Sequence, residues 1–263
     1  MNRADNLLAD QNDIERLGRR GRRLKDLRKR VKDRRDGEVI VDGRRLVSDL
    51  VRWGVPIREL YLVPEISGEF EAVGWRQSAE EVFELEASVL ADIAPTRNPQ
   101  GVLAIAEEPQ WPEWSAEGGV ALWLDRIRDP GNVGAIIRSA AGLGAEAALL
   151  SPDCADPYGA SAVRGSAGSV FRLPVGRDVG LAGVMVRVRD SGGEVWATDS
   201  LGQKIDGWQP SKPCLLLLGA EGVGLDPDIA ELADGTVAIP MSRGIESLNV
   251  AVATGILLQH LRR

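Results

Sequence analysis

Apolar and polar positions follow two different periods along the second half of the chain. Short apolar runs predict strands, and longer stretches with apolar residues every three or four positions predict helices. The predicted strands are Val120–Leu124, Ala147–Leu150, Val195–Thr198, Cys214–Leu218 and Val237–Ile239. The predicted helices are Val133–Leu143, part of Gly159–Val170, Leu181–Asp190, Pro227–Ala233 and Leu248–Leu261. This alternation predicts an α/β fold with a mostly parallel sheet and helices on both of its faces.

The first half has a similar but weaker pattern. The predicted strands are Val39–Val41, Ile57–Val63 and Val102–Ala106, and the predicted helices are Arg44–Trp53 and Ala79–Ala91. The segment Glu107–Gly119 breaks the periodicity with two prolines, four glutamates and a Gly-Gly pair. We therefore expect a small α/β domain over residues 1–106, a linker over 107–119 and a second domain over 120–263.

Charge is distributed unevenly between these regions. The formal net charge is −7, but residues 1–45 contain fifteen Lys or Arg and nine Asp or Glu, a balance of +6 against −13 for residues 46–263. Apolar residues recur at helical spacing within the basic run Arg16–Arg35, which predicts an amphipathic helix that could break at Gly18 or Gly21. Its cationic face is open to two interpretations, a solvated surface or a surface for nucleic-acid phosphates.

Several classes of protein are excluded by composition. Two cysteines and one histidine, His260, leave no set of ligands for a Cys/His zinc cluster and no disulfide framework. No apolar run approaches the roughly 20 residues of a membrane span. The N-terminus is polar and basic and has no secretory h-region. We therefore expect a cytoplasmic protein that does not associate with a membrane.

Three junctions between a strand and a helix contain the residues that chemistry could use. In the first, Leu124–Ala140, we expect Asn132 to cap the following helix. Gly134, Arg138 and Gly142 share one face of that helix. This face is consistent with close helix packing beside a surface arginine, and also with a surface that substrate approaches and on which the arginine binds an anion.

The other two junctions are rich in glycine and in capping residues. Within Cys214–Ile229, Gly219 and two further glycines permit close approach by a ligand, but they form neither a GxGxxG motif nor a P-loop. Turn chemistry leaves Glu221, between them, unexplained. In Ile239–Arg263 we expect Ser247 to cap the last helix and Asn249 to lie near its free N–H groups, for capping alone or for binding an anion.

Taken together, three segments resemble the signature of the SpoU/TrmH branch of the SPOUT RNA methyltransferases: DPGNVGAIIR, GAEGVGL and IPMSRGIESLNVAVATG. The resemblance implies transfer of a methyl group from S-adenosylmethionine to a ribose 2′-hydroxyl in RNA. It also implies a C-terminal trefoil knot, which sequence physics alone would not suggest, and a homodimer. The first half resembles the RNA-substrate-binding domain of that family.

The resemblance also implies roles for individual residues. The residues matching the cofactor site are Leu218, Gly219, Ile239, Met241 and Leu248. The residues matching the catalytic positions are Asn132, Arg138, Glu221, Ser247 and Asn249. No metal is expected, because the leaving group is a neutral thioether. The two-domain layout favours ribosomal RNA over transfer RNA, and the alternatives are a non-catalytic RNA-binding protein on the same scaffold and a nucleotide-binding enzyme.

Overall fold

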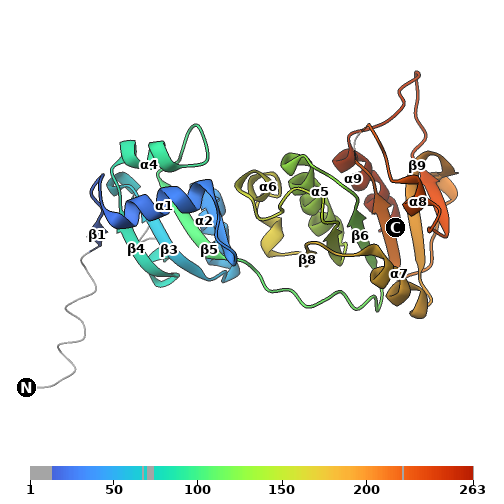
Figure 1. The fold of residues 1–263 in the computed structure, drawn as a ribbon, viewed down its shortest axis with the longest axis horizontal. Helices are drawn as coiled ribbons and strands as arrows, with labels where there is room; N and C mark the ends of the chain where they lie inside the picture. The colour runs from blue at the N-terminus through green and yellow to red at the C-terminus, as the bar shows by residue number, and fades with distance from the viewer. Residues whose placement is uncertain (1–13, 67, 70–73, 221, 263) are drawn as a thin grey trace, which may run out of the picture. The chain divides into compact units, whose positions relative to one another are not determined.

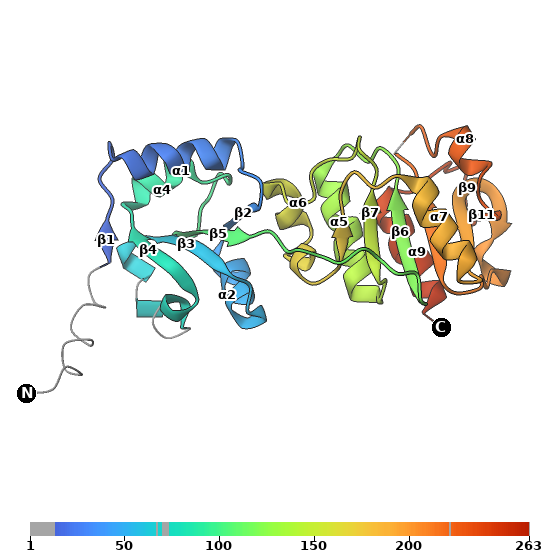
Figure 2. The same cartoon turned by 60° about the horizontal axis from the view of Figure 1, so that its bottom comes forward.

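The computed structural model describes residues 14–66, 68, 69, 74–220 and 222–262. The chain divides into two compact units at Glu108 and Pro109 (Figures 1 and 2). In the described residues, no helix is long and apolar enough to cross a membrane.

The described part of the first unit is a sheet with helices packed on it. The strands are β1 (Glu15–Arg16), β2 (Glu38–Asp42), β3 (Ile57–Leu62), β4 (Ala79–Glu84) and β5 (Val102–Glu107), in the order β1-β4-β3-β5-β2. The helices are α1 (Arg22–Lys32), α2 (Arg44–Trp53) and α4 (Ala87–Ile93). Strand β5 runs antiparallel to both of its neighbours, whereas β1, β4 and β3 are parallel to one another.

The predicted helix Ala79–Ala91 is wrong. Its first part is strand β4, and α4 begins only at Ala87. Pairing with β3 decides the conformation, because Phe83 lies opposite Tyr61 in the register and their rings stack with centroids 5.2 Å apart. Cross-strand packing of this kind overrides a local helical spacing.

Some residues of the basic run Arg16–Arg35 form contacts inside the first unit. Helix α1 begins after Gly21, and the preceding Glu15–Arg16 pairs with β4 as a strand. Arg30 is buried, with Nη2 2.8 Å from Glu38 Oε1 and Nη1 2.8 Å from Glu59 Oε1. Such a buried guanidinium holds the helix against the sheet, because removal of either partner would leave an uncompensated charge.

A second face of α1 remains cationic. Its exposed side chains form no hydrogen bond or ion pair with any of the described residues, and they are Arg22, Lys25, Arg28, Lys29 and Lys32. The helical period of 3.6 residues places them on one stripe. We call these five residues the α1 stripe.

The second unit is a parallel α/β domain. In its described part the strands are β6 (Val120–Leu124), β7 (Ala147–Leu150), β8 (Val175–Gly176), β9 (Glu194–Lys204), β10 (Cys214–Leu218) and β11 (Gly235–Ala238). They are all parallel, in the order β11-β9-β10-β6-β7-β8. The helices are α5 (Pro130–Leu143), α6 (Ala160–Gly165), α7 (Leu181–Asp190), α8 (Pro227–Ala230) and α9 (Val250–Leu261). The predicted α/β fold with a parallel sheet is confirmed.

Both faces of this sheet are buried. Val184 and Val188 of α7 pack in one cluster with Trp123, Leu215 and Leu217. The alternate positions of the same strands, which point to the opposite face, are also fully buried. Strand β9 is longer than the predicted Val195–Thr198, and its register with β11 shifts after Ala197 so that residues 198–202 leave the ladder.

Both ends of the segment 107–119 pack on the unit that they adjoin. The backbone N–H groups of Glu107 and Glu108 donate to carbonyls of the first unit. Trp114 and Ala116 belong to the core cluster of the second unit, where Trp114 Nε1 donates to Glu146 Oε2.

Gly134 is required by packing. A Cβ atom there would lie 2.4 Å from the carbonyl oxygen of Ala162 and 2.8 Å from the backbone nitrogen of Ser166. Helices α5 and α6 are therefore in backbone contact. Gly142, on the same helix, is exposed and has no atom within 4 Å of such a Cβ. Of the two interpretations of this glycine-flanked face, close packing accounts for Gly134.

The two glycines make a matched pair of substitutions. We expect Gly134→Ala to destabilise the second unit by about 1–3 kcal/mol, because the methyl group overpacks a backbone contact. Gly142→Ala should be neutral or stabilising by up to about 1 kcal/mol, because alanine favours the helix. Differential scanning calorimetry of the two variants measures both shifts. Equal shifts in the two variants would contradict the packing role of Gly134.

Candidate functional site

The strands β6 and β10 end side by side. Their parallel register pairs Leu124 with Leu218, and the backbone N–H of Asp125 donates to the carbonyl of Leu218 at 2.8 Å. The loops that follow the two strands therefore start at the same edge of the sheet. In parallel sheets this edge is where ligands bind.

A buried carboxylate connects these two loops. Asp125 is only 2% exposed, and its Oδ2 accepts from Arg126 Nη2 at 2.8 Å and from the backbone N–H of Asp226 at 3.3 Å. Arg126 also lies 3.6 Å from the carboxylate of Asp226. The hydrogen bond to Asp125, followed by the attraction of that charge, raises the pKa of the Arg126 guanidinium. The β6–α5 loop is thus held to the start of α8.

The helix caps differ from the predicted ones and leave two asparagines facing each other. Asp129 caps α5, accepting from the backbone N–H of Asn132, so Asn132 is not the cap. Asn249 caps α9 through its Oδ1, which accepts from Ala251 and Val252, so Ser247 lies outside the helix. The Nδ2 of Asn249 donates to Asn132 Oδ1 at 2.9 Å. Two side chains 117 residues apart in the sequence therefore meet at the N-termini of two helices.

The glycine-rich loop after β10 folds back on itself. A Cβ atom at Gly219 would lie 2.1 Å from the backbone nitrogen of Leu225, so this position is glycine because its own loop occupies the space. The N–H of Gly224 donates to the carbonyl of Ala220 at 2.8 Å, and Gly222 and Gly224 have φ of 77° and 75°. Glu221 lies outside the described residues.

A cavity of about 570 Å³ opens beside this loop. The five residues expected at the cofactor site all line it, together with Ser247 and Asn249. Its volume is within the range of small-molecule sites, about 300–1,000 Å³. Sequence reasoning missed four of its polar residues, which are Thr198, Asp199, Ser200 and Glu246. Thr198 is the last residue of the predicted strand Val195–Thr198, and Asp199 and Ser200 follow it. The rule that ligands bind at the carboxyl ends of parallel strands could therefore have identified these three residues.

The charge on the cavity wall is negative. Asp199 and Glu246 are its ionisable residues in the described part of the chain, and no lysine or arginine lines it. Such a wall disfavours a polyphosphate and suits a cationic ligand. No group of three or more His, Cys, Asp or Glu side chains that could hold a metal occurs among the described residues.

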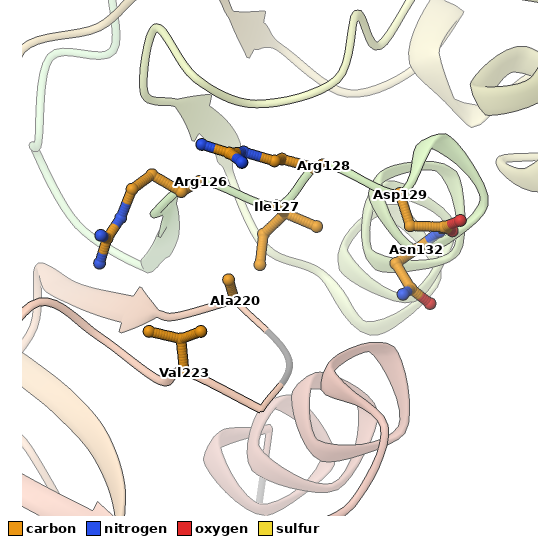
Figure 3. Close-up of a pocket in the computed structure, with 7 residues that line it drawn as sticks. All are labelled: Arg126, Ile127, Arg128, Asp129, Asn132, Ala220 and Val223. Carbon is orange, nitrogen blue, oxygen red and sulfur yellow. The ribbon is translucent and has the colours of Figure 1, made fainter.

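A second, smaller cavity lies next to the first. Its volume is about 310 Å³, and it shares Ala220 and Val223 with the larger cavity. Figure 3 shows Arg126 and Arg128 extending to the same side, while Ile127 between them points towards Ala220 and Val223. Asn132 also lines this cavity. Ala220 and Val223 of the glycine-rich loop thus belong to the walls of both cavities.

Arg138 occupies a different position from the other predicted residues. It is exposed on α5, lines neither cavity, and forms no hydrogen bond or ion pair with the described part of the chain. The structure therefore brings Asn132 and Asn249 together and places Ser247 beside the larger cavity. It leaves Arg138 on the surface of the helix that packs along α9.

Comparison with known proteins identifies two families of domain. Residues 119–259 match the model of the SpoU rRNA Methylase family, and residues 20–104 match that of the MRM3-like substrate binding domain. The chain is 34% identical over 252 residues to a 23S rRNA (uridine(2479)-2'-O)-methyltransferase of Streptomyces viridochromogenes, covering 89% of this chain and 86% of that protein. It is 29% identical to the 23S rRNA (guanosine(2553)-2'-O)-methyltransferase RlmP of Bacillus subtilis, over 85% of this chain and 88% of the other.

Solved structures give the same result over nearly the whole chain. An AdoMet-bound rRNA methyltransferase from Sinorhizobium meliloti matches with a TM-score of 0.81 and 32% identity, covering 95% of this chain and 97% of that one. The SpoU methyltransferase AviRb from Streptomyces viridochromogenes, in complex with AdoMet, matches with a TM-score of 0.80 and 31% identity, over 92% and 97% of the two chains. With more than half of its residues matched by the family model and with both described units accounted for, this chain belongs to the SpoU rRNA methylase family.

Proposed function

We propose that this protein transfers the methyl group of S-adenosylmethionine to a ribose 2′-hydroxyl of ribosomal RNA. The observation that carries the proposal is the pairing of Asn132 with Asn249 beside a ligand-sized cavity, on the scaffold of the SpoU family. The named relatives support ribosomal RNA as the substrate, because two of them are 23S rRNA 2'-O-methyltransferases. That substrate implies a cytoplasmic protein.

The larger cavity fits S-adenosylmethionine in volume and in charge. Apolar side chains of Leu218, Ile239 and Leu248 offer a surface for the adenine ring, and the carboxylates of Asp199 and Glu246 match a ligand with positive charge on its sulfonium and amino groups. When bound, the cofactor supplies a methyl group activated by the sulfonium. Leu218, Gly219, Ile239, Met241 and Leu248 would hold it.

The paired asparagines lie where the reacting hydroxyl has to be oriented. Asn249 is fixed by two backbone N–H groups of α9 and by Asn132, so neither amide is free to rotate. Alignment of the hydroxyl with the methyl group lowers the barrier by removing orientational freedom before the reaction. Ser247 borders the same cavity and can contribute a further hydrogen bond.

Arg138 completes the proposed set as a cation. A guanidinium stays protonated in proteins, so it donates hydrogen bonds to the hydroxyl oxygen and the neighbouring phosphate. As the 2′-oxygen takes the methyl group and the sulfonium leaves as a neutral thioether, the hydroxyl proton passes by way of that phosphate to solvent. Glu221 keeps its proposed catalytic role on the family resemblance alone.

We also propose a homodimer and the knotted C-terminal chain of the family. Val252 and Ile256, one turn apart on α9, are 52% and 39% exposed. An apolar stripe of this kind favours burial against a second copy of the helix. A dimer through α9 would also bring the exposed Arg138, on the adjacent helix α5, close to the interface. The support for the knot is the match to SpoU methyltransferase structures over nearly the full chain.

The central experiment measures methyl transfer and its dependence on Arg138. Labelled S-adenosylmethionine and purified bacterial ribosomal RNA should give label that survives alkaline hydrolysis as a dinucleotide, because a methylated 2′-oxygen cannot attack its phosphate. Arg138→Ala should lower this rate by at least about 10²-fold while cofactor binding stays normal. Arg138→Lys should fail to restore it, because an ammonium cannot hold hydroxyl and phosphate in one planar fork. Full turnover in Arg138→Ala would remove Arg138 from the site.

The glycine-rich loop provides a test of the cofactor cavity. We expect Gly219→Ala to weaken S-adenosylmethionine binding by tenfold or more in calorimetry, because the added methyl group prevents the loop from closing on Leu225. Gly180→Ala is the matched control, since a Cβ there has no atom within 4 Å and its φ is −70°. Normal cofactor affinity in Gly219→Ala would show that this loop is not a wall of the binding site.

The α1 stripe should recruit RNA. Replacing Arg22, Lys25, Lys29 and Lys32 by glutamine should weaken RNA binding and lower the slope of log affinity against log salt by about 0.7–0.9 for each lost phosphate contact. The control variant removes the same number of positive charges by replacing four arginines that already pair with carboxylates: Arg16, Arg19, Arg35 and Arg52. Filter binding to ribosomal RNA over a salt series compares the two. Equal slopes for both variants would contradict the assignment.

A further inference from the structure

We infer that Arg128 binds a phosphate of the RNA next to the methylated nucleotide, and that Arg126 is the residue that positions it. The inference rests on the proposed function and assigns a substrate contact within the smaller cavity. It concerns two arginines that lie between the strand β6 and the start of α5.

Arg128 is a cation with an open face. It is exposed, and no hydrogen bond or ion pair connects it to any other described residue. The adjacent carboxylate does not neutralise it by contact, since Asp129 accepts the backbone N–H of Asn132 as the cap of α5. An arginine that lines a cavity without a partner in its own chain is suited to an anionic ligand, which its fork can bind through two hydrogen bonds.

Arg126 also lines the smaller cavity, but its contacts differ from those of Arg128. Its guanidinium is held by Asp125 and Asp226, and its backbone N–H donates to Ser151 Oγ at 3.0 Å. Its φ is 53°, in the left-handed region that residues other than glycine rarely adopt. These contacts fix the path of the loop, and Ile127, 2% exposed, anchors it on the core side. Arg128 therefore leaves a rigid turn, on the same side as Arg126 (Figure 3).

The position of the smaller cavity selects the ligand. It contains Asn132 and shares Ala220 and Val223 with the cavity proposed for the cofactor. In RNA the 2′-hydroxyl is on the carbon next to the one that carries the 3′-phosphate. A ribose oriented by Asn132 towards the larger cavity therefore brings a phosphate to the neighbouring wall, where Arg128 is. The residues after Arg45 have a balance of −13, so Arg128 places a cation in this cavity against an acidic background.

The experiment compares Arg128→Ala, Arg128→Lys and Arg262→Ala in the full chain. Arg262 is a matched control, because it is exposed and its side chain has no partner among the described residues. It follows the last residue of α9, at the opposite end of that helix from the cap Asn249. The probes are purified bacterial 23S rRNA for binding and methyl transfer, and S-adenosylmethionine alone for calorimetry. Binding is measured over a salt series for each variant.

We expect Arg128→Ala to raise the RNA KM about tenfold, the effect of one charge-assisted hydrogen bond, with kcat and cofactor affinity nearly unchanged. The slope of log affinity against log salt should fall by about 0.7–0.9. Arg128→Lys should keep the slope, and Arg262→Ala should match the wild type.

Two results would overturn the inference: an unchanged salt slope in Arg128→Ala, or a loss of kcat at constant KM, which would place Arg128 in the chemical step. Failure of the wild-type protein to methylate any RNA would instead refute the proposed function. In that case the salt slope of binding still tests the phosphate contact.

Discussion

The parallel pairing of β6 with β10 is the constraint from which the site follows. Because Leu124 lies opposite Leu218, the first and second sequence motifs leave the sheet at the same edge. The third motif reaches that edge through α9, whose first turn faces the first turn of α5. A shift of one residue in this register would turn every side chain of β10 to the other face and separate the loops. The buried core of leucine and valine thus sets the geometry of the polar residues at this edge.

Much of this arrangement could be predicted from the chain. The apolar run Cys214–Leu218 lies between Pro213 and Gly219 and has no polar face, and the predicted strand is confirmed with the same bounds. The segment Ala79–Ala91 could not, because Val82, Leu85 and Val89 fit a helix and only the partner strand β3 makes Phe83 a strand residue. The spacing of apolar residues is ambiguous where pairing with a strand from another part of the sequence determines the conformation.

The residues of the site show a similar division. Gly219 and Ile239, which line the larger cavity, are expected there from the family motifs. The side chain that caps each helix could not be predicted in this way. Asp129 and Asn132 can both accept hydrogen bonds from free backbone N–H groups, and only the backbone conformation at each residue decides which of them caps α5. The same limit applies to charge: Arg30 and Lys29 are neighbours in one basic run, yet one is buried against two glutamates and the other is solvated. Pairing over long sequence distances separates them, and composition does not contain that information.

The backbone contact between α5 and α6 has a thermodynamic consequence for the two cavities. It fixes the start of α5, so Asn132, in the wall of the smaller cavity, loses little conformational entropy when a ligand arrives. In the larger cavity, the wall segment Met241–Leu248 is neither helix nor strand and is largely exposed. The ordering entropy of binding is therefore concentrated in this one segment. Binding of a ligand that orders this segment combines an unfavourable entropy with a favourable enthalpy and a negative change in heat capacity, the signature of a site that is half preformed and half completed by its ligand.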